Sequence, residues 1–157
     1  MKSSKVSLRP WTLEDIEFTL RVRNHPDLMK CFRQDKPLNY QQQYDFIKLD
    51  TGKFKSGYNG RVIQYQGQPV GLCGIKDTGE FTLGLLPEYQ GKGIATEAML
   101  QLINSYKGAE KIWSEVFVGN PALEWFIAKL GFRVTGVKER AYYKASLGLV
   151  DVVRIER

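Results

Sequence analysis

The sequence predicts an α/β domain built on a mixed β-sheet with helices on both faces. Three observations lead to this class. Runs with strand and helix periodicity alternate along the chain in the order β-α-α-β-β-β-α-β-α-β-β. Short turns join the three central strands, which predicts an antiparallel meander. A strand-helix-strand unit then follows, and such a crossover adds parallel pairing to the sheet.

The N-terminal elements are a short strand and two helices. Residues 6–9 have strand character, and Thr12 is placed to cap a helix with Asp15 as its capping-box partner. We expect this helix to end near His25, because a proline disfavours helical backbone in the residue before it. A second helix is predicted after Asn39. Its apolar face consists of Tyr40, Tyr44 and Ile47.

Three strands are predicted in the middle of the chain, after a glycine-containing segment at 52–60 that we interpret as a loop and a candidate lid. The strands cover residues 61–66, 70–77 and 80–86. The segments between them are rich in turn-forming residues and short enough for hairpins.

The C-terminal half continues with helices at 93–106 and 121–130 and strands at 112–118, 132–143 and 149–155. In the first of these helices, apolar residues recur along one stripe. In the second, Pro121 suits the first turn and Gly131 is placed to end the helix.

The composition is that of one ordinary globular domain covering residues 1–157, of which 43% are hydrophobic. The N-terminal residues lack the apolar core of a secretory signal, and no apolar run is long enough to span a membrane. Cys31 and Cys73 stand alone, which argues against a disulfide framework or a metal site. We therefore expect a cytoplasmic protein without a metal, and we interpret neither cysteine as a nucleophile.

The net charge of +6 is unevenly distributed. Residues 1–64 and 129–157 are basic, whereas residues 65–128 carry a net negative charge. One interpretation of this pattern is that it keeps the protein soluble. The other is that the two basic flanks bind an anionic partner such as a phosphate-bearing substrate or RNA.

The segment PEYQGKGIATEA, at 87–98, carries the main functional signal. Small residues precede a helix whose first N–H groups have no acceptor within the helix and can surround a pyrophosphate. A Walker A loop is excluded because Lys92 is followed by Gly93 rather than by Ser or Thr. A dinucleotide fingerprint fits poorly because position 96 is threonine. A purely structural turn is the remaining alternative.

The same segment resembles the GNAT (GCN5-related) N-acetyltransferase superfamily. Residues 90–95, QGKGIA, match its signature Q/R-x-x-G-x-G/A, which binds the pyrophosphate of coenzyme A. The longer run EFTLGLLPEYQGKGIATEAM resembles the branch of the ribosomal-protein-alanine N-acetyltransferases, as does VGNPALEWFIAKLGF. The order of elements is similar to the GNAT fold along essentially the whole chain, including a central strand pair that splays apart.

The resemblance implies that acetyl-CoA is the co-substrate and indicates which residues bind it. The strand backbone at Leu83, Gly84 and Leu85 would pair with the pantetheine arm. The loop and the first helical turn would hold the pyrophosphate, and Asn120 would contact the coenzyme or cap the following helix. The loop residues are Gln90, Gly91, Lys92, Gly93, Ile94, Ala95 and Thr96.

Two carboxylates, Glu80 and Glu115, are candidates for the base that accepts a proton from the attacking amine. Each can also be an exposed strand glutamate or part of a structural ion pair. The tyrosine that many GNAT enzymes use as the acid for the leaving thiolate is replaced here by Ile127. Because a thiolate leaves readily, the loss of this acid is compatible with turnover. Substitute hydroxyl groups could come from Tyr142, Tyr143 or Ser146.

The sequence says least about the amine that accepts the acetyl group. The run RVRNHPDLMKCF resembles a segment of the acetyltransferases that act on nucleotide-linked amino sugars. On this interpretation, phosphates would meet Arg21, Arg23, Arg33 and Lys36. The same residues can instead form an exposed helix face and a helix stop, with His25 as a cap.

Other functions are open at this level. The acceptor can be a protein N-terminus or a charged tRNA, and the chain can be an acyl-CoA-binding module without turnover. A homodimer is compatible with the resemblance, and no membrane partner is expected.

Overall fold

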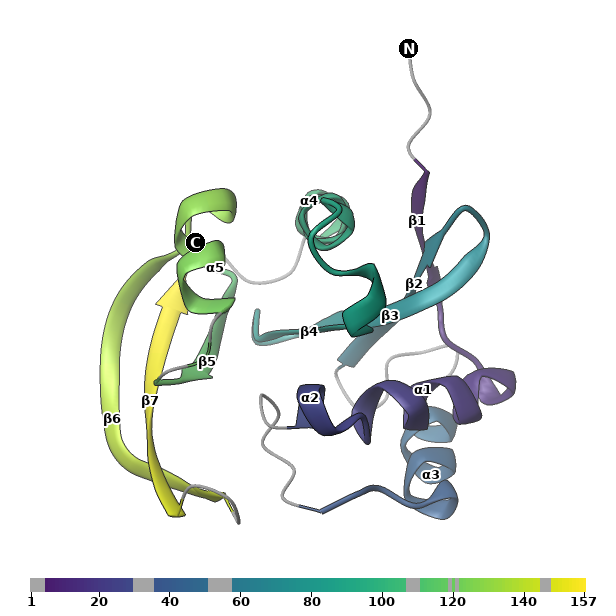
Figure 1. The fold of residues 1–157 in the computed structure, drawn as a ribbon, viewed down its shortest axis with the longest axis horizontal. Coiled ribbons are helices and arrows are strands. Elements are labelled where there is room, and N and C mark those ends of the chain that lie inside the picture. Colours follow the sequence, from purple (N-terminus) through teal and green to yellow (C-terminus); the bar gives the residue numbers. More distant parts are fainter. Residues whose placement is uncertain are drawn as a thin grey trace.

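The computed structural model describes residues 5–29, 36–50, 58–106, 111–118, 120, 122–144 and 148–157. Its elements follow the predicted order, with three additional short helical segments, η1, α2 and η2 (Figure 1). The N-terminal elements are β1 (Val6–Pro10), η1 (Leu13–Asp15), α1 (Ile16–Arg23), α2 (Pro26–Met29) and α3 (Tyr40–Asp50). The central elements are β2 (Tyr58–Tyr65), β3 (Gln68–Lys76), β4 (Phe81–Leu85), η2 (Pro87–Tyr89) and α4 (Ile94–Ser105). The last elements are β5 (Trp113–Phe117), α5 (Ala122–Leu130), β6 (Arg133–Lys144) and β7 (Gly148–Glu156).

The predicted capping box is present at the entry to the first helix. The Thr12 hydroxyl accepts from the Glu14 backbone N–H, and the Asp15 carboxylate accepts from the Thr12 N–H at 2.7 Å. Asp15 also accepts two hydrogen bonds of 2.8 Å from the Arg9 guanidinium. One carboxylate therefore joins β1 to the start of α1.

The Arg9–Asp15 contact gives the first testable prediction. Burial opposes the charge of Asp15, but hydrogen bonds from Arg9 and Thr12 outweigh it and lower the pKa of this carboxyl. The stabilisation is therefore complete above the unfolded pKa of about 4 and is lost as the pH falls through the folded pKa. We expect Asp15→Ala to lower the free energy of unfolding by about 1–2 kcal/mol at neutral pH.

Urea unfolding of the wild type and the Asp15→Ala variant across the acidic range measures this effect. The difference between the two proteins should shrink as the pH falls below about 4 and be smallest below the lowered pKa of the native carboxyl, where the group is neutral in both states. Glu14→Ala, at the exposed neighbouring position, is the control and should change stability little at any pH. A difference that stays constant with pH would contradict the role of the charge.

The first four strands form an antiparallel sheet in the order β1-β2-β3-β4. The β2–β3 turn consists of Gln66 and Gly67, both with positive φ, which is the backbone conformation of a tight hairpin. The prediction placed this turn one residue later. Of the predicted loop at 52–60, residues 58–60 belong to β2 and the remainder lies outside the described residues.

The last three strands form a second antiparallel sheet in the order β5-β7-β6. The two sheets meet at one parallel bridge between Glu80 and Trp113, so the mixed sheet is present but interrupted. At this point the Trp113 backbone N–H donates to the Gly79 carbonyl at 3.0 Å, and its indole N–H donates to the Thr78 carbonyl at 3.0 Å. Beyond the bridge, the described parts of β4 and β5 diverge (Figure 1), as the predicted splay requires.

Helices cover both faces of the four-stranded sheet (Figure 1). On one face, Ile94, Met99 and Leu102 of α4 join a core that extends to α5 and β7. On the other face, Ile16, Val22 and Ile47 from α1 and α3 pack in a second core that includes Trp11. Each such buried side chain contributes about 1.5–3 kcal/mol, so the helices that border the splay are firmly anchored.

The inward face of α3 differs from the prediction. Ile47 is fully buried and Tyr44 is half-buried, but Tyr40 is 55% exposed and does not join the core. The inward position one turn before Ile47 is occupied by Gln43, which is 4% exposed. Periodicity alone missed this residue because a glutamine does not add to an apolar stripe.

Of the two cysteines, only Cys73 lies within the described residues. Cys73 lies in β3 and is completely buried, and desolvation raises the pKa of its thiol to about 12. A thiol with such a pKa is not a nucleophile at neutral pH, in agreement with the interpretation of the sequence. Cys31 lies outside the described residues.

Candidate active site

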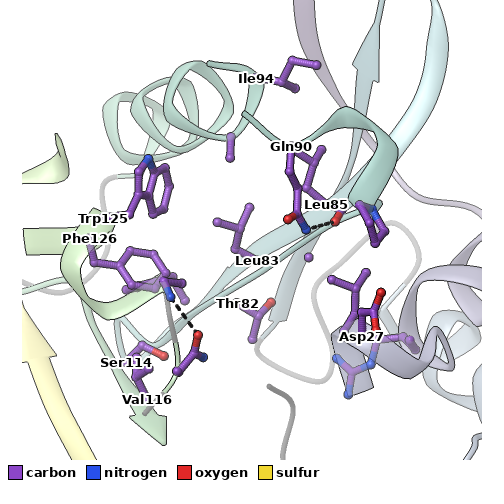
Figure 2. Close-up of a pocket in the computed structure, with 18 of the residues that line it drawn as sticks. Asp27, Thr82, Leu83, Leu85, Gln90, Ile94, Ser114, Val116, Trp125 and Phe126 are labelled. Atoms are coloured by element: carbon purple, nitrogen blue, oxygen red, sulfur yellow. Dashed lines mark hydrogen bonds between the residues drawn. The ribbon is translucent and has the colours of Figure 1, made fainter. Parts of the chain in front are cut away.

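A cavity of about 970 Å³ opens where β4 and β5 diverge. Its walls come from α1, α2 and α3 on one side, β4 and β5 at the centre, and α4 and α5 on the other side (Figure 2). Nearly every predicted site residue lines this cavity, although these residues are spread from position 80 to position 120. The exception is Lys92, which is exposed on the loop with its Nζ 5.7 Å from the centre of the Tyr89 ring.

The predicted pantetheine strand is β4. Leu83, Gly84 and Leu85 pair with β3 along one edge, while the other edge borders the cavity. One carbonyl of β4 already has a side-chain partner, because the Gln90 amide donates to the Leu85 oxygen at 2.9 Å (Figure 2). Gln90 therefore fastens the loop to the end of the strand and also lines the cavity.

The glycines of the predicted loop are required by the backbone. Gly91 and Gly93 have φ values of +78° and +80°, and a Cβ at either position would have no neighbouring atom within 4 Å. The left-handed conformation, and not a lack of space, therefore explains why glycine stands there. It turns the chain so that α4 begins at Ile94 with its N-terminus at the cavity.

The first turn of α4 has the geometry expected of an anion site. The first intrahelical bond runs from the Glu97 N–H to the Gly93 carbonyl, so the N–H groups of residues 94–96 precede it. These groups have no acceptor within the helix, and the helix dipole adds positive potential at the same place. Ile94, Ala95 and Thr96 all line the cavity, which fits the binding of a pyrophosphate.

Trp125 is a cavity residue that the sequence reasoning missed. Its indole N–H donates to the Thr96 hydroxyl at 3.1 Å, which links α5 to the first turn of α4. Both proposed roles of Asn120 are compatible with its position. Its side-chain oxygen accepts from the Ala122 N–H at 2.9 Å, as a helix cap does, and the residue also lines the cavity.

The two candidate bases lie at the floor of the splay. Glu80 is adjacent to β4, and its carboxylate lies 2.8 Å from the Lys76 ammonium. The Glu80 side chain is 12% exposed. Glu115 lies in β5, 3.4 Å from the Lys138 ammonium, with 6% of its side chain exposed. Both line the cavity, so both can reach a substrate and both are also held by ion pairs.

The usual acid position is remote from the site. Ile127 is 42% exposed on α5 and does not line the cavity. Among the described residues, the lining contains no tyrosine, histidine or cysteine, although Ser114 on β5 adds a hydroxyl group beside Glu115. The side chains of Tyr142 and Tyr143, and the whole of Ser146, lie outside the described part of the structure.

The end of the cavity that we assign to the acceptor is formed by the N-terminal helices and the loop after β1. Its walls include the apolar side chains of Trp11, Leu28, Leu38 and Phe46. Its polar residues are Arg23, Asp27, Gln42 and Gln43.

The basic residues predicted for this end do not all lie at the cavity. Arg23 lines the cavity, whereas Arg21 is exposed and lies 3.1 Å from Glu88 on the outer surface. Lys36 is also exposed and outside the lining, and Arg33 lies outside the described residues. Of the three described cations, only Arg23 belongs to the cavity lining, and the action of these cations on phosphates stays a prediction.

The segment after α1 has a structural role. The Asn24 side chain accepts from the Leu38 N–H at 2.7 Å and donates to the Leu38 carbonyl at 2.8 Å. The His25 ring nitrogen accepts from the Asp27 N–H at 3.2 Å, so this histidine caps α2 as expected. Neither side chain is free for catalysis in this arrangement.

Within the described residues, no three His, Cys, Asp or Glu side chains come together as a metal site would require. No helix in the same part of the chain has the length and apolar character needed to cross a membrane.

Comparison with known proteins gives concordant results. The family model of the acetyltransferase (GNAT) domain matches residues 5–133. Spermidine N(1)-acetyltransferase of Escherichia coli (strain K12) is 26% identical over 149 residues, which cover 83% of this chain and 74% of that protein.

Two solved structures show the likeness of the fold. Spermidine N-acetyltransferase from Vibrio cholerae, in complex with CoA and spermine, superposes with a TM-score of 0.82 at 20% identity and covers 99% of this chain and 96% of its own. Ribosomal-protein-alanine N-acetyltransferase from Brucella melitensis superposes with a TM-score of 0.81 at 16% identity. The match covers 96% of this chain and 98% of that protein's chain.

Proposed function

The chain belongs to the GNAT acetyltransferase domain family, and we propose that it transfers the acetyl group of acetyl-CoA to the primary amine of a small molecule. One observation carries the proposal. The left-handed glycine loop and the free amides at the start of α4 open into the same cavity as the carboxylates of Glu80 and Glu115. A site for a pyrophosphate and a site for a proton acceptor are therefore connected.

The chemistry needs alignment of the two substrates, polarisation of the thioester and removal of a proton from the amine. Bound acetyl-CoA supplies the thioester. The amides of residues 94–96 and the loop bind its pyrophosphate, and the free edge of β4 orients its pantetheine arm. Backbone N–H groups along the splay can donate to the thioester carbonyl, while a carboxylate at its floor accepts the proton. The amine nitrogen then attacks the thioester carbon within a ternary complex, the C–S bond breaks, and coenzyme A leaves as its thiolate.

The described charges of the cavity are nearly balanced. Its described ionisable residues are the cations Arg23 and Lys76 and the carboxylates of Asp27, Glu80 and Glu115. Lys76 is paired with Glu80, and Glu115 is paired with Lys138. Beyond these two pairs the lining carries Arg23 and Asp27, whose charges are opposite, so Asp27 is the carboxylate that can attract a cationic amine. Spermidine, which the related enzyme from Escherichia coli acts on by its name, is a test compound of this kind. A nucleotide-linked amino sugar would have to rely on Arg23.

Calorimetric titration with acetyl-CoA, followed by thiol-release assays on polyamines, nucleotide-linked amino sugars and peptides, tests the proposal. Binding together with turnover of one amine class would establish the enzyme and its acceptor class. Turnover of a charged tRNA that falls steeply with salt would support the RNA alternative instead. Binding without turnover of any amine would favour an acyl-CoA-binding module. Absence of binding would refute the assignment of the loop.

The catalytic carboxylate is identified by single substitutions. We expect either Glu80→Gln or Glu115→Gln to lower kcat by about 10²–10⁴-fold and to remove the acidic limb of its pH profile. Glu88→Gln is the matched control, because Glu88 is exposed and does not line the cavity. Unchanged kcat values in both active-site variants would exclude the two carboxylates as the base.

A further inference from the structure

The inward face of α3 places a buried glutamine at the acceptor end of the cavity. Gln43 is 4% exposed and belongs to the cavity lining, and Ile47 is fully buried one turn later. The Gln43 side chain makes no hydrogen bond in the described part of the structure, whereas both preceding glutamines are engaged. Gln41 donates to Asp45 at 2.8 Å, and Gln42 accepts from the Asn39 N–H at 2.8 Å.

Although the Gln43 side chain is largely buried, neither of its polar atoms is completely enclosed by the described residues, so the polar atoms of the carboxamide reach the cavity. The carboxamide carries two N–H donors and one carbonyl acceptor, and a polar group that loses water without a replacement weakens the folded state. Leu28, a neighbour at this end of the cavity, has no polar side-chain group that could act as a hydrogen-bond partner. Only contact with the cavity can satisfy the group. Water can do so in the free protein, and a ligand that displaces this water must restore its hydrogen bonds.

We propose that Gln43 determines acceptor specificity by selecting primary amines that carry a hydroxyl or amide group over amines with a bare hydrocarbon chain. This inference rests on the proposed function, because it concerns the acceptor of the same site. A hydrocarbon chain placed against Gln43 would leave the carboxamide buried and unpaired. Sites built for a hydrogen bond reject ligands that lack the group for this reason.

The ionic part of recognition belongs to a different residue. Asp27 on α2 is exposed and lines the same end of the cavity, and its carboxylate suits a second ammonium group. A carboxamide is neutral and matches a neutral hydroxyl or amide group more closely. Asp27 therefore accounts for a preference for acceptors with a second positive charge, and Gln43 for a preference for acceptors with a neutral hydrogen-bonding group.

A matched series of acceptors tests the assignment. For each chain length, kcat/KM is measured by thiol release for the n-alkylamine, the ω-amino alcohol, the ω-amino amide and the diamine. We expect the wild-type enzyme to favour the amino alcohol or amino amide over the alkylamine roughly tenfold to a hundredfold. Gln43→Leu should remove this preference by raising KM for the polar acceptors, with little change in the kcat/KM for the alkylamine.

Gln43→Met, which keeps the length of the side chain, should behave as Gln43→Leu does. Both variants should unfold near the wild-type temperature, because each replaces the Gln43 side chain with an apolar one of similar size at a largely buried position. Gln41→Leu makes the same replacement on the exposed side of α3 and should leave acceptor preference unchanged.

The outcomes separate the inference from the function on which it rests. If no amine is acetylated although acetyl-CoA binds, the proposed function fails. If amines are acetylated but the wild type does not distinguish alkylamines from polar amines, the role of Gln43 is overturned. The same holds if the preference survives in Gln43→Leu and Gln43→Met, or if only the diamine is preferred and Asp27→Asn alone removes that preference.

Discussion

Replacement of Gly93 by valine is expected to weaken the binding of coenzyme A at least a hundredfold. Gly93 has a φ of +80° at the N-cap of α4, a conformation that a β-branched residue strongly resists. A valine there must either strain the loop or shift the start of the helix. Because a Cβ at this position meets no protein atom within 4 Å, it would extend into open space beside the amides proposed to hold the pyrophosphate.

The experiment compares Gly93→Val with Gly67→Val. Gly67 has a φ of +82° and the same open surroundings, but it lies in the β2–β3 turn and does not line the cavity. Both variants should lose similar thermal stability, while calorimetric titration with coenzyme A should show weakened binding only for Gly93→Val. Equal affinity in the two variants would refute the assignment of the loop as the pyrophosphate site.

The second large effect is expected at Gly60 in β2. A methyl group on Gly60 would overlap the indole ring of Trp11, which is 6% exposed and packs between β2 and α3. Trp11 also lines the acceptor end of the cavity, where the ring of Phe46 meets its edge at a centroid distance of 5.9 Å. We therefore expect Gly60→Ala to lower the free energy of unfolding by about 1–3 kcal/mol, as overpacked cores do.

Displacement of Trp11 should also raise KM for the acceptor, because the indole lies at the acceptor end. The dissociation constant for coenzyme A should change less. Urea unfolding and steady-state kinetics measure the two effects. Gly136→Ala is the control, since a Cβ at Gly136 in β6 meets no atom within 4 Å. The double variant Trp11→Leu with Gly60→Ala should be less destabilised than the sum of its parts, because the smaller side chain leaves room for the methyl group. Strict additivity would show that the two residues do not compete for space.

Local patterns were sufficient for the elements and for the coenzyme loop. The capping box at Thr12, the meander of β2 to β4 and the glycines at 91 and 93 each depend on residues close in sequence. Such features are determined by backbone conformation and by periodicity, which a sequence displays directly. The resemblance to the GNAT family added the roles of Asn120 and of the two carboxylates, and all three residues line the cavity.

The partners of those residues could not be predicted, because they come from distant parts of the chain. Lys138 approaches Glu115 only because β7 lies between β5 and β6. Trp125 reaches Thr96 because α5 packs beside α4, and the sequence offered no local signal for that contact.

The sequence by itself determined the order of the elements, the glycine loop before α4 and the grouping of the candidate residues around one cavity. The tertiary structure alone decided which side chains of each helix meet the cavity. Arg21 and Arg23 are two positions apart and therefore point about 200° apart around α1, so Arg23 lines the cavity while Arg21 faces outward. Gln43 lines the cavity because α3 packs against α1 with that face inward. Burial depends on which surfaces meet in three dimensions, and neither composition nor spacing contains that information.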